Sequence, residues 1–297
     1  NHLCKTTARD ELRYGHALDV AQAGIEVATR FGLPNTGYVK CGKAKAYYRL
    51  QRLDECLATL DDALANGTSH TESFLLLALC RIAVGERQSA EDWYAVTCEL
   101  IAKHKWDITP LHREVASELQ LPLNWIRKDW DRREHVELYN RLIAEMPKVA
   151  MLHYCRGSHR GRMGNWDRAK ADYSQAHELD PGNHRAFEAA TAIAIFNGTL
   201  EERRTAVEAF LEYGKERSSM NAKMDVVLMC SLAPSNDVDR HEVDRLADEV
   251  LGALPTRYFL KLAKGMSLYR VQRYEESLSK LPQGSHNNPK DELLAVL

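Results

Sequence analysis

The chain has 297 residues and a formal net charge of −2, so it lacks the overall basic field that holds nucleic acid or an anionic membrane. Its 44% hydrophobic and 28% charged residues are typical of a folded protein, long enough for one elongated or two compact domains. Its seven cysteines are scattered without zinc-ligand or C-x-x-C spacing, which indicates reduced thiols and a cytoplasmic location.

The N-terminal residues NHLCKTTARD contain neither a methionine nor an apolar segment. We therefore expect no signal peptide and interpret the chain as a piece of a longer protein. The longest apolar run, FLLLALC at 74–80, is far too short to cross a bilayer, so we expect no membrane partner.

Residues 37–44, GYVKCGKA, come close to the phosphate-binding pattern G-x-x-x-x-G-K-[ST]. That loop requires a preceding strand and a Ser or Thr after the lysine, whereas here a turn, RFGLPNT, precedes it and Ala44 occupies the last position. The sequence instead predicts the first helix of a hairpin over 37–49, whose backbone N–H groups are satisfied within the helix.

A helical period dominates the chain, as in DECLATLDDALANG (54–67) and EVDRLADEVLGAL (242–254). The stretch 44–64 aligns with 78–98 at an offset of 34 residues, which superposes Ala44 on Ala78. A fixed period of this length indicates stacked helical hairpins rather than an independent globular fold.

Two further copies are clearer. One copy is residues 150–183, AMLHYCRGSHRGRMGNWDRAKADYSQAHELDPGN. It has small residues where its two helices would touch and Gly or Pro where they would end. Residues 258–281 repeat this pattern with Gly265 and Ser277. The matching positions are Gly157, Gly164, Ala169, Tyr173, Ala176 and Pro181. These residues resemble the tetratricopeptide repeat (TPR) consensus, which implies an all-α right-handed solenoid of about six antiparallel hairpins.

Weaker helical stretches at 10–30, 111–146 and 184–254 separate these copies. We predict N-terminal TPR-like repeats over 1–121 and C-terminal TPR-like repeats over 122–285. A polar tail with a short capping helix is expected over 286–297. Pro122 and the poor motif after it suggest a kink between the two sets.

The copies at 74–103, 150–183 and 258–281 also resemble repeat regions of planctomycete-type bacterial serine/threonine kinases and WD-repeat proteins. This resemblance implies an attached repeat region, with any catalytic domain lying outside the chain. It covers most of 37–281.

Catalytic signatures are missing from the sequence. HRE at 112–114 is the nearest match to the kinase H-R-D, and HEVDR at 241–245 lacks the second histidine of H-E-x-x-H. His153, Cys155 and His159 are close in sequence, but residues two apart on a helix face different ways, so we interpret them as surface and packing residues. We expect no enzyme activity in this chain and no catalytic, cofactor-binding or metal-binding residue.

Two groups of side chains have a structural and a functional interpretation. The basic run RGSHRGR at 156–162 could contact acidic groups, but we predict a solvated helix face. The five tryptophans could form a binding cage, but we predict that they lie in the core. They are Trp93, Trp106, Trp125, Trp130 and Trp166.

The resemblance implies a concave groove lined by the first helices of successive repeats. The register places Tyr and Arg side chains there, which are the residues expected in binding hot spots. The alternative is that they are ordinary exposed helix residues. The predicted groove residues are Lys45, Tyr48, Arg49, Tyr154, Ser158, Arg162, Tyr269 and Arg270. The Lys and Asn positions of the carboxylate clamp that binds chaperone tails hold Cys41, Lys45 and Leu76, so a chaperone-tail reader is disfavoured.

We therefore predict a protein–protein interaction scaffold or regulatory module that binds a peptide, or a domain of its own parent chain, in this groove. One alternative is the substrate-positioning region of a parent serine/threonine kinase. A second alternative, a nucleic-acid-binding solenoid, requires a basic stripe that the near-neutral charge disfavours.

Overall fold

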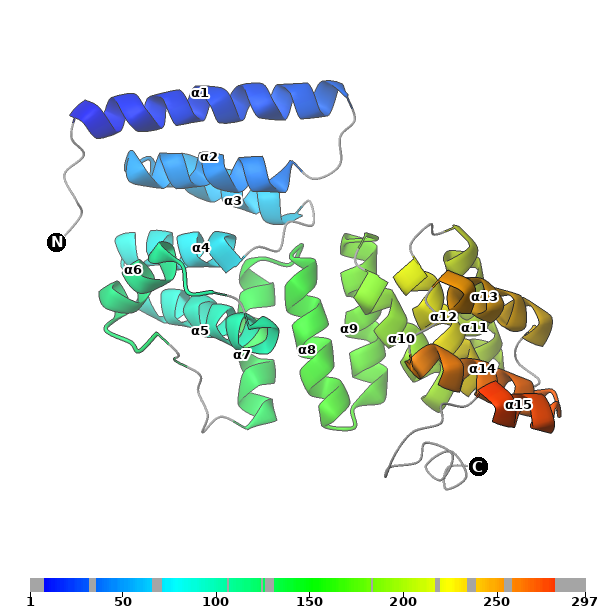
Figure 1. Cartoon of the computed structure of the whole chain (residues 1–297). Helices are drawn as coiled ribbons and strands as arrows, with labels where there is room; N and C mark the ends of the chain where they lie inside the picture. Colours follow the sequence, from blue (N-terminus) through cyan, green and yellow to red (C-terminus); the bar gives the residue numbers. More distant parts are fainter. Residues whose placement is uncertain are drawn as a thin grey trace. The chain divides into compact units, whose positions relative to one another are not determined.

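The structure is a computed structural model. It describes residues 8–31, 36–65, 71–105, 107–123, 125, 131–182, 184–216, 220–233, 239–253 and 258–280. In these residues all regular structure is helical (Figure 1). The helices are α1 (Ala8–Arg30), α2 (Gly37–Arg49), α3 (Leu53–Ala65), α4 (Thr71–Ala83), α5 (Arg87–His104), α6 (Pro110–Leu119), α7 (Arg132–Glu145), α8 (Ala150–Arg162), α9 (Trp166–Leu179), α10 (His184–Asn197), α11 (Leu200–Glu216), α12 (Met220–Leu232), α13 (Arg240–Ala253), α14 (Tyr258–Arg270) and α15 (Tyr274–Lys280).

The 34-residue period appears directly in the helix boundaries. α2 and α4 begin at 37 and 71, and α3 and α5 begin at 53 and 87. The same spacing separates α8 from α10 (150 and 184) and α9 from α11 (166 and 200). The predicted all-α helical-repeat fold is confirmed, and the stretch after 184 that looked weak in sequence begins with a hairpin in register.

A left-handed residue closes four of the hairpins. Gln51, Gly85, Gly164 and Gln272 have φ of 59°, 85°, 77° and 64°, and each lies 14 positions after the start of its first helix. This conformation reverses the chain after one helix so that the second can pack back on it. Glycine adopts it without a Cβ clash, whereas glutamine is strained there by roughly 1–2 kcal/mol.

Small residues bring the two helices of a hairpin together. A Cβ added at Gly157 would lie 3.1 Å from the Asp172 Cβ and from the Tyr173 ring, so α9 would have to shift by a few tenths of an ångström to admit a larger residue. Ala44 in α2 is fully buried in the same register. Helix 37–49 is therefore confirmed, and its GYVKCGKA sequence is part of a packed helix rather than a phosphate loop.

The chain divides into two compact units, Asn1–Asn183 and His184–Leu297. The sequence placed a division between residues 121 and 122 instead. In the structure, one hydrophobic core of the first unit runs from Cys41 to Cys155 and so includes residues on both sides of that position. The predicted tail, 286–297, lies outside the described residues.

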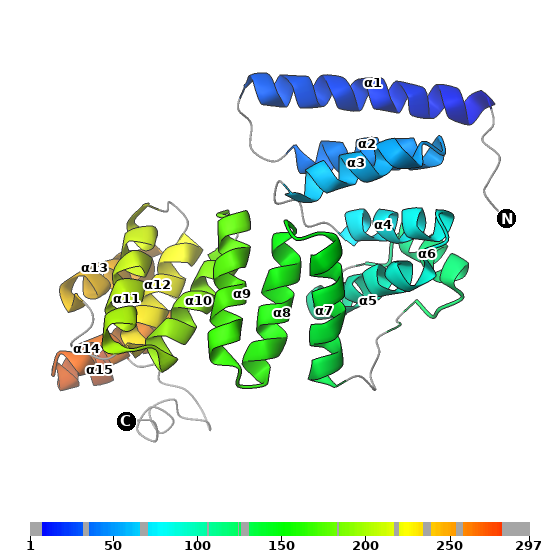
Figure 2. The ribbon, with the colours of Figure 1, turned by 180° about the vertical axis from the view of Figure 1, so that it is seen from behind.

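The first unit departs from the repeat at α6 and α7. α6 packs mainly on α4, whereas α7 packs on α8 and α5 (Figures 1 and 2). In the connection between them, the Tyr94 hydroxyl donates a hydrogen bond to the Pro122 carbonyl at 3.1 Å, and Trp125 stacks on the Tyr94 ring at 6.0 Å. Asp131 starts α7 with a capping box, its carboxylate accepting from the backbone N–H of Glu134.

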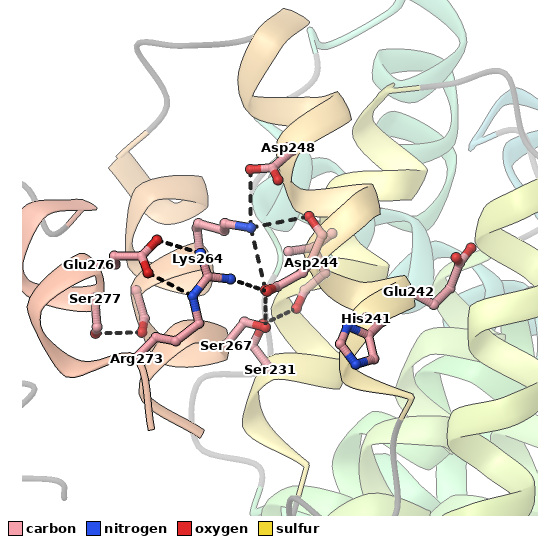
Figure 3. A network of polar contacts seen from close by, with 12 residues as sticks. Ser231, His241, Glu242, Asp244, Asp248, Lys264, Ser267, Arg273, Glu276 and Ser277 are labelled. Carbon is pink, nitrogen blue, oxygen red and sulfur yellow. Dashed lines mark hydrogen bonds and ion pairs between the residues drawn. The ribbon is translucent and has the colours of Figure 1, made fainter. Parts of the chain in front are cut away.

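The second unit buries Phe210, Val226, Val227 and Leu246 in its own core. Polar contacts join its last three helices (Figure 3). The Nζ of the buried Lys264 on α14 lies 3.1 Å from Asp248 and 3.4 Å from Asp244, both on α13. The Ser277 hydroxyl on α15 donates to the Gly265 carbonyl at 2.6 Å, which fixes the small-residue contact of this hairpin.

Two predictions about side chains need correction. Trp166 is 44% exposed rather than in the core, because it begins α9 at the hairpin end, where no further helix covers it in the described residues. Trp93 is fully buried and Trp125 packs against the core, as predicted, whereas Trp106 and Trp130 lie outside the described residues.

The basic run at 156–162 is not a uniformly solvated face. Arg156 and Arg160 both donate hydrogen bonds to the buried carboxylate of Asp172 on α9, at 2.7 and 2.9 Å. Within this run only Arg162, two residues after Arg160, is exposed. The sequence run could not reveal this because its partner lies on the other helix of the hairpin.

Candidate interaction site between α5 and α8

A hollow of about 230 Å³ opens between α5 and α8 in the first unit. It lies where α7 packs against both of these helices. Its lining combines one carboxylate, two cations, a hydroxyl, a thiol and a methyl group. The lining residues are Glu99, Ala102, Lys103, Cys155, Ser158 and Arg162.

One lining residue, Glu99, connects the helices around the hollow through hydrogen bonds of its carboxylate. Glu99 of α5 accepts from the Tyr139 hydroxyl of α7 at 2.9 Å and lies 3.0 Å from Nε2 of His159 on α8. Burial alone would raise the pKa of Glu99, but His159 and Tyr139 outweigh it and hold that pKa below its ordinary value. The His135 ring stacks on His159 at 4.7 Å. Three helices therefore meet at one negatively charged group whose oxygens are already occupied.

Two other groups that line the hollow, the Cys155 thiol and the Ser158 hydroxyl, are not activated as nucleophiles. Burial raises the pKa of the Cys155 thiol to about 12, so it is a neutral thiol and a poor nucleophile at neutral pH. The Ser158 hydroxyl interacts with Tyr173, whose pKa burial raises to about 12. This arrangement suits binding better than covalent chemistry.

The rim carries two cations without a carboxylate partner. Among the described residues, neither Lys103 nor Arg162 pairs with an Asp or Glu side chain within 4 Å. Lys103 instead lies over the Tyr154 ring, 5.3 Å from its centroid. The Arg132 guanidinium donates to the Arg162 carbonyl at 2.6 Å and adds a third positive charge nearby.

Several other arginines of the first unit pair with carboxylates of the same unit. Arg49 makes a two-pronged contact with Glu114 on α6, and Arg141 pairs with Asp92 at 2.8 Å. Arg81 likewise pairs with Glu145. Against this background, the uncompensated positive charge at the hollow marks it as the candidate binding site.

Two of the predicted groove residues, Ser158 and Arg162, line this hollow, and a third, Tyr154, contacts its Lys103. Lys45 and Arg49 on α2 instead face acidic groups, Lys45 at 3.8 Å from Glu72 and Arg49 at Glu114.

Tyr48 packs against the hydrophobic core, and burial raises its pKa. Tyr269, in the second unit, is 36% exposed and meets Tyr274 edge-on at 5.3 Å, with Arg270 next to it at the end of α14. The binding roles of all these residues stay predictions.

Sequence reasoning missed Glu99 and Lys103. Both lie in the helical stretch 74–103, four residues apart and therefore on one helix face. That spacing is a weak signal, because such pairs are common on solvated helices. Nothing in the sequence indicated that α8 would lie opposite them.

Metal ligands, membrane spans and carboxylates with shifted pKa values also bear on what the described residues can do. No group of three potential metal ligands occurs among the described residues, and no helix in that part of the chain is long and apolar enough to cross a membrane. In the second unit, burial and the nearby Asp225 raise the pKa of Glu188 to about 7. Burial also raises the pKa of Asp225, with His184 opposing it.

No family model matches the sequence. It is 34% identical over 108 residues to the rice (Oryza sativa subsp. japonica) protein SGT1 homolog, which corresponds to 36% of this chain and 28% of that protein. The chain thus matches well under two thirds of that relative's length.

Solved structures similar to the chain are helical repeats of low identity. The C-terminal part of a TPR repeat-containing protein from Cytophaga hutchinsonii has a TM-score of 0.38 and 11% identity, covering 91% of this chain and 95% of that one. The P58(IPK) TPR domain has a TM-score of 0.30 and 14% identity, covering 92% and 89%. The human IFIT1 dimer with PPP-AAAA has a TM-score of 0.28 and 16% identity, covering 90% and 67%. The helical-repeat fold of this chain rests on its own hairpins and their 34-residue register.

Proposed function

We propose that this chain is a non-catalytic helical-repeat interaction module and that a segment of a protein partner binds it at the α5–α8 hollow. The observation that carries the proposal is the pair of uncompensated cations, Lys103 and Arg162, beside a preorganised hollow. Charge and shape are thus available together at one place, on a unit in which Arg49, Arg81 and Arg141 are paired with carboxylates.

The size of the hollow favours a side chain over a cofactor. Its volume of about 230 Å³ falls below the roughly 300–1,000 Å³ of sites that enclose drug-sized ligands. Tyr154 and Arg162 offer the rigid ring and forked donor that dominate protein interfaces. A partner would insert one group here and spread the rest of its contact over neighbouring helix surfaces, including the predicted Tyr48 and Arg49.

The same proposal includes a cytoplasmic location and a role within a larger bacterial signalling protein. The described cysteines are all buried and unpaired, as in a reducing compartment. A parent chain with a kinase or WD-repeat domain could supply the partner segment itself.

A display library of unmodified random peptides tests the proposal with the full chain. We expect selected peptides to bind the wild type and to lose at least tenfold in affinity when Lys103→Glu and Arg162→Glu are combined. Arg113→Glu combined with Arg168→Glu, which reverses two exposed charges outside the hollow, is the matched control. Circular dichroism checks that all proteins are equally helical.

Two results would contradict this proposal. If no peptide, unmodified or with a modified side chain, binds the wild type, the chain is not a peptide-binding module. If peptides bind but the double variant retains them, the contact lies elsewhere. A further variant, Tyr269→Ala with Arg270→Ala, then tests the contact predicted in the second unit.

A further inference from the structure

The charge around the hollow is specific enough to suggest the chemistry of the bound group. Lys103 approaches from α5 and Arg162 from the end of α8, with the Ser158 hydroxyl on the same lining. The only carboxylate in the lining, Glu99, already accepts from Tyr139 and lies within hydrogen-bond distance of His159. The Ser158 hydroxyl is engaged by Tyr173. The charged groups left to meet a ligand are therefore the two cations.

We infer that the hollow binds a phosphate monoester carried by a side chain of the partner. The inference rests on the proposed function, since it names the group that a partner segment inserts. A phosphorylated side chain carries a charge of about −1.5 to −2 at pH 7 and three strong acceptor oxygens. The donors of the Lys103 ammonium and the Arg162 guanidinium match that charge and those acceptors, whereas one carboxylate would leave a cation uncompensated.

The fixed geometry of the site supports phosphate recognition. An arginine presents a planar fork of donors to phosphate oxygens, and a lysine acts as a point charge beside them. The Lys103 ammonium lies over the Tyr154 ring, 5.3 Å from its centroid, and the Arg132 guanidinium donates a hydrogen bond to the Arg162 carbonyl. Arg132 also raises the local positive potential and so favours a dianion over a monoanion.

Three peptide libraries with a degenerate sequence and a fixed central residue test the inference on the full chain. The central residue is phosphoserine, glutamate or serine, and binding is measured by fluorescence anisotropy at constant ionic strength. We expect phosphoserine to bind at least tenfold more tightly than serine and clearly more tightly than glutamate. The preference for phosphoserine should weaken below about pH 6, where the phosphate becomes a monoanion.

Substitutions assign the preference to the hollow. Lys103→Ala combined with Arg162→Ala should abolish the phosphoserine preference, whereas the charge-matched control, Arg113→Ala combined with Arg168→Ala, should keep it. Arg162→Lys should retain part of it, because a charge remains without the fork. Circular dichroism and urea unfolding check that the variants fold.

The outcomes separate this inference from the proposed function. Equal binding of the three libraries, or a phosphoserine preference that survives the double variant, would overturn the phosphate assignment while peptide binding stands. Equal binding of glutamate and phosphoserine would also overturn it, in favour of a carboxylate site. If the three libraries and the display library all fail to bind, the proposed function itself fails.

Discussion

The first unit contains a regular hairpin, α8–α9, beside a split pair, α6 and α7. The regular hairpin is closed by one left-handed residue, Gly164, and its helices start 16 residues apart. The split pair is joined by a connection from 120 to 131, and its helices pack on different neighbours. In the regular hairpin, residues of α8 and α9 themselves fill the space between the two helices. Beside α7, residues of α5 and α8 come together and leave a hollow.

This difference shows how a repeat can gain a hollow without a new element. A tight turn forces the second helix to cover the first, whereas a longer connection releases that constraint. The polar residues of both regions are then used differently. Asp172 neutralises two arginines inside the regular hairpin, while Glu99 links three helices and leaves the cations beside it uncompensated.

The largest expected effect is at the regular hairpin. Asp172→Ala should lower the free energy of unfolding by about 3 kcal/mol, because Arg156 and Arg160 would lose their buried partner. Urea unfolding measures it. Asp167→Ala, an exposed acid on the same helix, should change stability by less than about 0.5 kcal/mol. Equal effects of the two substitutions would show that the buried cluster does not hold the hairpin together.

At the split pair, Glu99→Gln should cost about 1.5 kcal/mol at pH 7, since charge-assisted contacts with His159 and Tyr139 are weakened. The pKa of Glu99 is lowered by folding, so its contribution is complete above about pH 4.5, its ordinary pKa. The contribution disappears as pH falls through the lower folded pKa. Unfolding curves of both proteins from pH 7 to 3 should therefore converge at the acid end, and parallel curves would contradict this role.

Tyr94→Phe should destabilise the split pair by about 1 kcal/mol. The substitution removes the hydroxyl that donates to Pro122 and lies 2.9 Å from His112 Nε2, while the ring can still stack on Trp125. Hydrogen exchange should show faster opening at residues 121–125 and unchanged protection in α8. Equal acceleration in both places would mean that the two regions unfold together.

The smallest effects are expected at the turns. Gly164→Ala should cost about 0.5–1 kcal/mol because alanine is strained at φ 77°. Gln51→Gly should change stability by less than about 0.5 kcal/mol, since relief of strain at φ 59° is offset by greater freedom of the unfolded chain. Thermal unfolding measures both. A large loss at Gln51 would show that its side chain, rather than its backbone, matters in the turn.

The sequence by itself determined the helices and their period. Ala44, Gly157 and Ala169 are small where helices touch, and the 34-residue offset places the hairpins at 37 and 71 without reference to tertiary contacts. Local signals suffice here, because turn residues and helical periodicity act between neighbours along the chain. Tyr154, Ser158 and Arg162 could be predicted as surface candidates for the same reason.

Only the tertiary structure decided which charges remain available. Arg49, Arg156 and Arg160 look as free in sequence as Arg162, but carboxylates 65, 16 and 12 residues away neutralise the first three. Lys103 becomes part of the site because α7 brings α5 next to α8. Pairing across such separations depends on how helices pack, and no local pattern encodes it.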